Sequence, residues 1–164
     1  MEKKYIFIGP AGSGKTTLIN MLLKDKKFEV FDIIKVMKPY IEKYGFVTNK
    51  NKKVLDEVVD EFTKQLMNKN FDILEFATGL YLTQILKALR DNDVTVVYCK
   101  CSKRICVDRL VKRRRKIPQH YLDYQFKFGS SYYKKLNKRF NFKLVILDTS
   151  DTKKAYLILK RILI

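Results

Sequence analysis

Short apolar segments recur along the chain, and longer segments with helical periodicity separate them. Five of these apolar segments predict β-strands, at 5–8, 28–31, 72–76, 94–98 and 143–147. Each is a short apolar run rather than a regular alternation of apolar and polar residues, which is typical of strands that are buried on both faces of a parallel sheet. We therefore expect a five-stranded sheet whose strands lie in the interior of the protein.

The segments between the strands carry apolar residues at the spacing of an α-helix. Such residues mark one face of segment 55–66 and one face of segment 82–89. Helices are also predicted at 17–24, 33–44 and 152–163. The alternation of strands and helices predicts a three-layer, open, parallel α/β sheet with helices on both faces and right-handed crossovers. In such sheets, functional residues gather at the carboxyl ends of the strands.

The length of the chain and its breaks fit one domain. The 164 residues are expected to form a single domain over 1–164, with a polar loop at 45–53. Pro118 is expected to end a helix that follows the fourth strand, because the residue before a proline avoids the helical conformation. The apolar run near the amino terminus lasts only to Ile8, too short for a signal peptide or a membrane span. We therefore expect a cytoplasmic protein without a membrane partner.

The first strand leads into Gly9-Pro10-Ala11-Gly12-Ser13-Gly14-Lys15-Thr16, which matches G-x-x-x-x-G-K-[ST]. A strand before this motif and a helix after it are the context of a phosphate-binding P-loop. The backbone N–H groups of the loop and the dipole of the following helix point at the same place, where they attract a triphosphate. We therefore expect nucleotide contacts from the following residues: Gly9, Gly12, Ser13, Gly14, Lys15, Thr16 and Thr17. Lys15 is expected to reach the β- and γ-phosphates, and the Thr16 hydroxyl to ligate Mg²⁺.

Two carboxylates are predicted at the same edge of the sheet. Glu75 lies inside an apolar strand, where an unpaired carboxylate is costly to bury, so we expect it to support Mg²⁺; a salt bridge at the strand end is the alternative. Asp32 follows the second strand and is a candidate to orient or deprotonate a phosphate acceptor. A helix cap for segment 33–44 is the alternative interpretation of Asp32.

A basic helix is predicted after the fourth strand. Arg109 and Arg113 are four residues apart and therefore share one helical face, from which guanidinium groups can stabilise a transferring phosphoryl group. The five consecutive cations at 112–116 are also typical of a solvated basic surface. The aromatic residues within 121–133 can stack on bases, but their helical spacing is equally typical of core positions.

The net charge and the cysteine content add only limited information on possible partners and metal binding. The net charge is +18, from 35 Lys and Arg against 17 Asp and Glu, which attracts phosphates of any kind and makes a nucleic-acid partner possible. Scattered lysines are also typical of an ordinary solvated surface. Cys99, Cys101 and Cys106 lack the second ligand pair of a zinc site, so buried or half-buried thiols are expected.

These features together resemble the P-loop kinases of the nucleotide- and nucleoside-kinase-like group along nearly the whole chain. The residues that carry the resemblance are 9–17, 28–32, 73–79, 101–115 and 146–150. The resemblance implies a sheet order of 2-3-1-4-5 and a basic helical lid at about 109–120. It also implies that Arg109 and Arg113 contact the phosphates of ATP. Thr149 and Ser150, in the loop after the fifth strand, would border its adenine.

The expected function is therefore an ATP- and Mg²⁺-dependent phosphotransferase that acts on a nucleotide, a nucleoside or a similar small acceptor. No Asp-Gly-Tyr/Phe-Pro-Arg segment follows the third strand, as in adenylate kinases, and no Asp-Arg-Tyr or Asp-Arg-Ser appears, as in thymidylate and deoxynucleoside kinases. The subfamily and the acceptor therefore stay open. A 5′-hydroxyl kinase of RNA or DNA is one alternative, and an ATPase switch with a nucleic-acid or protein partner is another.

Overall fold

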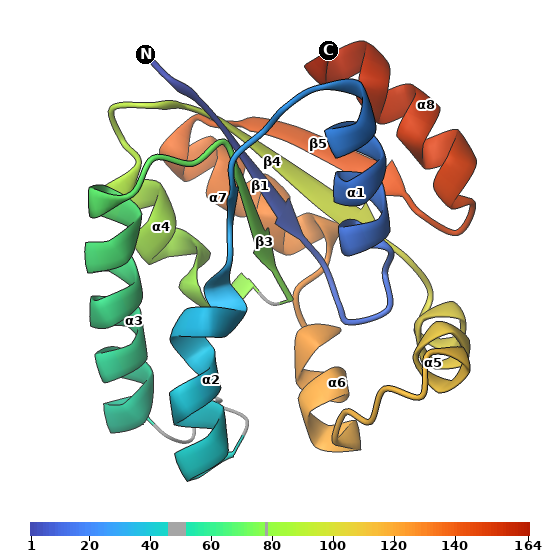
Figure 1. The fold of residues 1–164 in the computed structure, drawn as a ribbon, viewed down its shortest axis with the longest axis horizontal. Helices are drawn as coiled ribbons and strands as arrows, with labels where there is room; N and C mark the ends of the chain where they lie inside the picture. Colours follow the sequence, from blue (N-terminus) through green and yellow to red (C-terminus); the bar gives the residue numbers. More distant parts are fainter. Residues whose placement is uncertain (46–51, 78) are drawn as a thin grey trace.

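A computed structural model describes residues 1–45, 52–77 and 79–164, which form a three-layer α/β fold around one parallel sheet (Figure 1). The strands are β1 (Lys3–Ile8), β2 (Val30–Phe31), β3 (Ile73–Phe76), β4 (Asp93–Lys100) and β5 (Lys143–Asp148). Every neighbouring pair is parallel, and the order is β2-β3-β1-β4-β5. The predicted fold class and the sheet order implied by the family resemblance are both confirmed. The loop predicted at 45–53 lies largely outside the described residues.

Helices cover both faces of this sheet. They are α1 (Lys15–Asp25), α2 (Ile33–Tyr44), α3 (Lys52–Asn68), the 3-10 turn η1 (Gly79–Tyr81), α4 (Leu82–Ala88), α5 (Lys103–Lys112), α6 (Gln119–Gln125), α7 (Ser130–Phe140) and α8 (Thr152–Leu163). Helices α1 and α8 pack on one face, while α3, α4 and α7 pack on the other (Figure 1). In the described part of the chain, no helix has the length and apolar character needed to cross a membrane.

Strand β1 lies at the centre of the sheet, and this position explains why its sequence is apolar throughout residues 5–8. Its side chains alternate between the two cores: Phe7 packs among the residues of α1 and α8, whereas Ile6 and Ile8 pack among those of α3 and α4. All three side chains are fully buried. A strand with a helix layer on each face needs apolar residues at successive positions, and this is why the segment shows no polar alternation.

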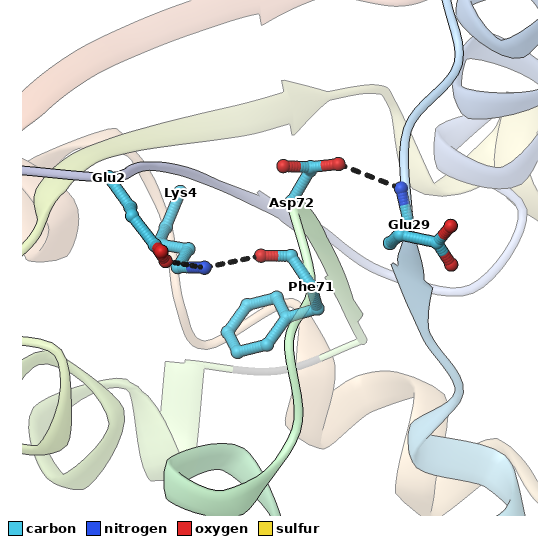
Figure 2. Close-up of polar contacts among 5 residues, drawn as sticks. All are labelled: Glu2, Lys4, Glu29, Phe71 and Asp72. Atoms are coloured by element: carbon cyan, nitrogen blue, oxygen red, sulfur yellow. Dashed lines mark hydrogen bonds and ion pairs between the residues drawn. The ribbon is translucent and has the colours of Figure 1, made fainter.

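The amino edge of the sheet is held by polar contacts of Lys4 and Asp72 (Figure 2). The Nζ of Lys4 donates to the Phe71 carbonyl at 2.6 Å and forms an ion pair with Glu2 Oε2 at 2.8 Å. The Glu29 N–H donates to Asp72 Oδ2 at 2.8 Å, which ties the start of β2 to the start of β3. Strand β2 was predicted at 28–31, but only its last two residues pair with β3. A hollow of about 360 Å³ lies beside Lys4, away from the P-loop.

The basic helix ends earlier than predicted. Helix α5 stops at Lys112, so most of the 112–116 cluster lies beyond it. Arg114 has φ 51°, and the N–H of Arg115 donates to the Leu110 carbonyl at 3.0 Å, as in a Schellman helix end. The physical reason is that Leu110 is the last buried residue of α5, and the cations that follow offer nothing apolar to continue its packed face.

Candidate active site

The P-loop follows β1 and rests directly on the backbone of neighbouring elements. A Cβ atom at Gly9, where φ is +152°, would lie 2.6 Å from the Cys99 carbonyl oxygen at the end of β4. A Cβ atom at Gly12, where φ is +82°, would lie 2.5 Å from the Cys106 carbonyl oxygen in α5. Both distances are shorter than any real contact of a Cβ atom, so glycine is required at these two positions by close packing.

Lys15 is buried in the loop with its ammonium bonded to neutral oxygens. The side chain is 6% exposed, and its Nζ donates to the Gly9 carbonyl at 2.8 Å and to the Pro10 carbonyl at 3.0 Å. Burial lowers the pKa of Lys15, and the negative charge of Glu75 partly opposes that effect. A phosphate oxygen would offer this ammonium a stronger, charge-assisted bond than the carbonyls do.

Thr16 and Glu75, the two residues predicted to bind Mg²⁺, are in direct contact. The Thr16 hydroxyl donates to Glu75 Oε1 at 2.6 Å. The pairing of β1 with β3 brings them together, since Glu75 lies opposite Phe7 in the sheet and the P-loop begins two residues after Phe7. Mg²⁺ prefers oxygen ligands and is usually bound by one or two protein groups together with phosphates and water. The hydroxyl and the carboxylate therefore fit Mg²⁺ bound with a nucleotide.

Asp32 lies at the same edge, one strand further from the P-loop. It directly precedes α2, and the Lys35 N–H donates to Asp32 Oδ1 at 3.4 Å, as in a helix N-cap. The side chain of Lys35 also forms an ion pair with Asp32 at 3.9 Å. The capping contact weighed from the sequence is therefore present, while the role of Asp32 toward an acceptor stays a prediction.

The two predicted arginines both reach the P-loop. Arg109 donates from Nη1 to the Gly12 carbonyl at 3.3 Å and from Nη2 to the Thr149 carbonyl at 2.8 Å and the Ser150 carbonyl at 3.0 Å. Arg113 is the residue that caps α5, and it donates from Nη2 to Thr17 Oγ1 at 3.0 Å. Arg109 thus links the P-loop to the loop after β5, and Arg113 lies beside the start of α1.

Gln125 at the end of α6 contacts the P-loop and was missed by the sequence analysis. Its side chain is 1% exposed, and its Oε1 accepts the Ala11 N–H at 2.7 Å. Leu122 packs with Ala11 in the same small apolar cluster. The signal in the sequence was a glutamine three residues after Leu122, on the apolar face of the helix. A polar residue in such a position needs a buried partner.

The three cysteines are buried free thiols, as expected. Burial raises the pKa of Cys99 and the pKa of Cys106 to about 12 in each case. Thiols with such pKa values stay protonated and are poor nucleophiles at neutral pH. Their place in this region is beneath the P-loop, where the backbones of Cys99 and Cys106 contact Gly9 and Gly12.

Comparisons with known proteins find matches to the fold of this chain but none to its sequence. No family model matches the chain, and no curated protein matches it. Solved structures do match. A deoxyadenosine kinase from M. mycoides with bound dATP has a TM-score of 0.69 at 21% identity, over 98% of this chain and 99% of that one. A gluconokinase from Sinorhizobium meliloti has a TM-score of 0.67 at 13% identity, over 98% and 93%. A shikimate kinase from Acinetobacter baumannii in complex with shikimate has a TM-score of 0.65 at 18% identity, over 99% and 94%.

Identities this low establish likeness of fold alone. The chain has the fold of the nucleotide- and nucleoside-kinase-like P-loop kinases, the group that its sequence motifs resemble. The three matched kinases are named for acceptors of different chemistry: a nucleoside, a sugar acid and a ring-bearing carboxylic acid. The shared fold therefore does not identify what this chain acts on.

Proposed function

We propose that this protein is a kinase that transfers a phosphoryl group from ATP to a small acceptor, with Mg²⁺ as cofactor. The contact between Thr16 and Glu75 is the observation that carries the proposal. A P-loop by itself binds phosphate, but a carboxylate from β3 bonded to its threonine supplies the second oxygen ligand of a nucleotide-bound metal.

Each residue of the site has a defined task in such a transfer. Lys15 exchanges its carbonyl partners for phosphate oxygens and offsets the negative charge of the triphosphate. Thr16 and Glu75 would hold Mg²⁺, which would offset charge on the β- and γ-phosphates. The guanidinium groups of Arg109 and Arg113 lie beside the P-loop, where they stabilise charge on the transferring group.

The acceptor is expected at the same edge of the sheet, on the β2 and β3 side of the P-loop. Asp32 is our candidate for the group that orients the acceptor hydroxyl or takes its proton. The loop containing Thr149 and Ser150 follows β5, on the other side of β1 from β2 and β3, and is our candidate border for the adenine.

The test is ADP release from ATP and Mg²⁺ in the presence of a panel of acceptors. The panel contains nucleosides, nucleoside monophosphates, sugar acids, shikimate and 5′-hydroxyl oligonucleotides. We expect at least one small acceptor to raise ADP release about tenfold or more over the basal rate, and Lys15→Met to abolish that increase. A response to oligonucleotides alone would favour a polynucleotide kinase, and a basal rate that no acceptor raises would contradict a kinase.

A further inference from the structure

The hydroxyl of Tyr81 is a buried polar group that the fold itself does not use. Tyr81 ends the η1 turn, which lies beyond the carboxyl end of β3, and its side chain is 4% exposed. Its Oη is buried and has no hydrogen-bond partner among the residues that the structure describes. A hydroxyl that is buried and unpaired destabilises the folded state, whereas phenylalanine would fill the same core without that cost.

The hydroxyl of Tyr132, in the surrounding aromatic cluster, is paired, in contrast to that of Tyr81. Tyr132 Oη donates to the Gly79 carbonyl at 3.0 Å, so it holds the start of η1 against α7. Burial is the main cause that raises the pKa of Tyr81, and the nearby hydroxyls of Tyr121 and Tyr124 add to it. The Tyr81 hydroxyl therefore stays protonated at neutral pH, where it can both donate and accept a hydrogen bond.

Three aromatic side chains form a wall against the η1 turn that contains Tyr81: Tyr124 from α6, Phe128 from the segment between α6 and α7, and Tyr132 from α7. Tyr124 and Phe128 meet edge to face with their centroids 5.5 Å apart, and Phe128 meets Tyr132 in the same way at 4.9 Å. The wall presses directly on η1, because a Cβ atom at Gly79 would lie 2.7 Å from the Tyr132 ring and 2.9 Å from the Phe128 ring. A surface of ring faces and edges suits a flat, largely apolar body better than an acyclic polyol.

The aromatic wall lies next to elements that contact the P-loop. Helix α6 supplies Tyr124 to the wall and, one residue later, Gln125 to the P-loop at Ala11. Strand β3 supplies Glu75 to Thr16 and leads into η1. Tyr81 and its aromatic neighbours are therefore flanked by two elements that each contact the P-loop. Figure 1 shows α6 and the end of β3 at the same edge of the sheet.

We propose that the Tyr81 hydroxyl hydrogen-bonds the phosphate acceptor, and that this acceptor is a ring-bearing molecule whose ring packs on the wall formed by Tyr124, Phe128 and Tyr132. The proposal rests on the kinase function proposed above and narrows its acceptor class. The polar atom at the ring edge of the acceptor supplies the partner that the Tyr81 hydroxyl lacks in the free protein. A phenylalanine at this position would keep the packing and lose the bond.

The test uses Tyr81→Phe in the full chain, with Tyr5→Phe as a matched control in the opposite core. Tyr5 is also a buried tyrosine, but it packs with α1 and α8 rather than with the wall. For the best acceptor of the panel we expect the KM of Tyr81→Phe to rise about tenfold or more. The KM for ATP and the basal ATP hydrolysis should stay within about twofold, and the melting temperature should not fall, because no bond of the free protein is removed.

A binding measurement keeps this inference independent of turnover. The melting temperature is measured with 2′-deoxyadenosine, thymidine, shikimate or the acyclic gluconate added to the ADP-bound protein. We expect at least one ring-bearing probe to raise it, gluconate not to, and the rise to shrink in Tyr81→Phe but not in Tyr5→Phe. A Tyr81-dependent rise without turnover would contradict the kinase function and support this binding site. Turnover with an unchanged acceptor KM, an equal rise in Tyr81→Phe, or no rise with any ring-bearing probe would overturn the inference.

Discussion

The two edges of the sheet each contain a buried lysine, and the two lysines differ in what they contact. Lys4 at the amino edge is 5% exposed and meets a carboxylate, Glu2, together with the Phe71 carbonyl. Lys15 at the carboxyl edge is 6% exposed, and its hydrogen bonds go to two carbonyls and the Ser13 hydroxyl. The amino edge neutralises its charge within the protein, whereas the carboxyl edge keeps a cation whose hydrogen-bond partners are neutral.

Two carboxylates near the opposite ends of β3, those of Asp72 and Glu75, also differ in what they contact. Asp72, just before the strand, accepts the Glu29 backbone N–H and so joins two strands. Glu75, near the other end, accepts a side-chain hydroxyl from Thr16 in the P-loop. One carboxylate joins two strands of the sheet, and the other holds a residue of the P-loop. Burial and hydrogen bonding alone therefore do not identify a functional group; the charge and the nature of its partner do.

The largest expected effect comes from exchanging the two lysines for methionine in separate variants. Lys15→Met should lower kcat/KM at least ~10²-fold, because the donor to the phosphate charge is lost. Its stability should change little, because the unfavourable burial of the ammonium disappears together with the bonds to the two carbonyls. Lys4→Met should keep its activity and lose about 1 kcal/mol of unfolding free energy, because its bond to the Phe71 carbonyl disappears. Steady-state kinetics and urea unfolding measure both. If Lys15→Met kept near-normal turnover, the site would be wrongly placed.

Asp32 is the exception at the carboxyl edge, because its carboxylate already caps α2. Asparagine caps helices as well as aspartate does, so Asp32→Asn removes the charge and keeps the cap. We expect kcat/KM for the acceptor to fall about 10²-fold while the affinity for ATP stays constant. Asp32→Ala serves as the control, with about 1 kcal/mol of stability lost in addition. Full activity in Asp32→Asn, with destabilisation only in Asp32→Ala, would reduce Asp32 to a helix cap.

The two carboxylates at β3 allow a matched test of metal binding. Glu75→Gln keeps an oxygen for the Thr16 hydroxyl but loses its charge, so we expect the Mg²⁺ concentration for half-maximal activity to rise about tenfold. Asp72→Asn keeps an acceptor for Glu29 and should leave the Mg²⁺ dependence unchanged. The measurement is a Mg²⁺ titration at fixed ATP. A large drop in the melting temperature of Glu75→Gln, with an ordinary Mg²⁺ response, would instead favour a structural role for Glu75.

The smallest expected effect is at Gln125. Gln125→Leu removes the acceptor of the Ala11 N–H, so the P-loop is held less tightly, and we expect kcat/KM for ATP to fall several-fold, up to about tenfold. Gln65→Leu on α3 is the control. Among the described residues, the side chain of Gln65 forms hydrogen bonds with Glu61 and Lys69, and neither belongs to the P-loop. Equal kinetics in both variants would restrict Gln125 to a packing role.

The local sequence pattern predicts those features of the protein that are determined by residues close together in the sequence. The buried run of β1 and the existence of a helix after the P-loop follow from short sequence windows, although α1 begins at Lys15 rather than at the predicted residue 17. The end of α5 was misjudged, because its last buried residue, not the proline further on, determines where packing ends. The roles of Gln125 and Tyr81 could not be predicted. They depend on residues far away in the sequence, Ala11 for Gln125 and the aromatic wall for Tyr81, and hydrophobic periodicity carries no information on such long-range contacts.

The two glycines that rest on the Cys99 and Cys106 carbonyls have a consequence for how this sequence can diverge. Backbone atoms of β4 and α5, not a nucleotide, exclude a side chain at Gly9 and Gly12. A descendant that had lost the proposed kinase activity would still need both glycines in order to fold. Lys15 has no such protection, because its hydrogen bonds go to carbonyls and a hydroxyl of its own loop rather than to other elements of the fold. Among distant descendants, the glycines would therefore mark common ancestry, and the lysine would mark which of them are still enzymes.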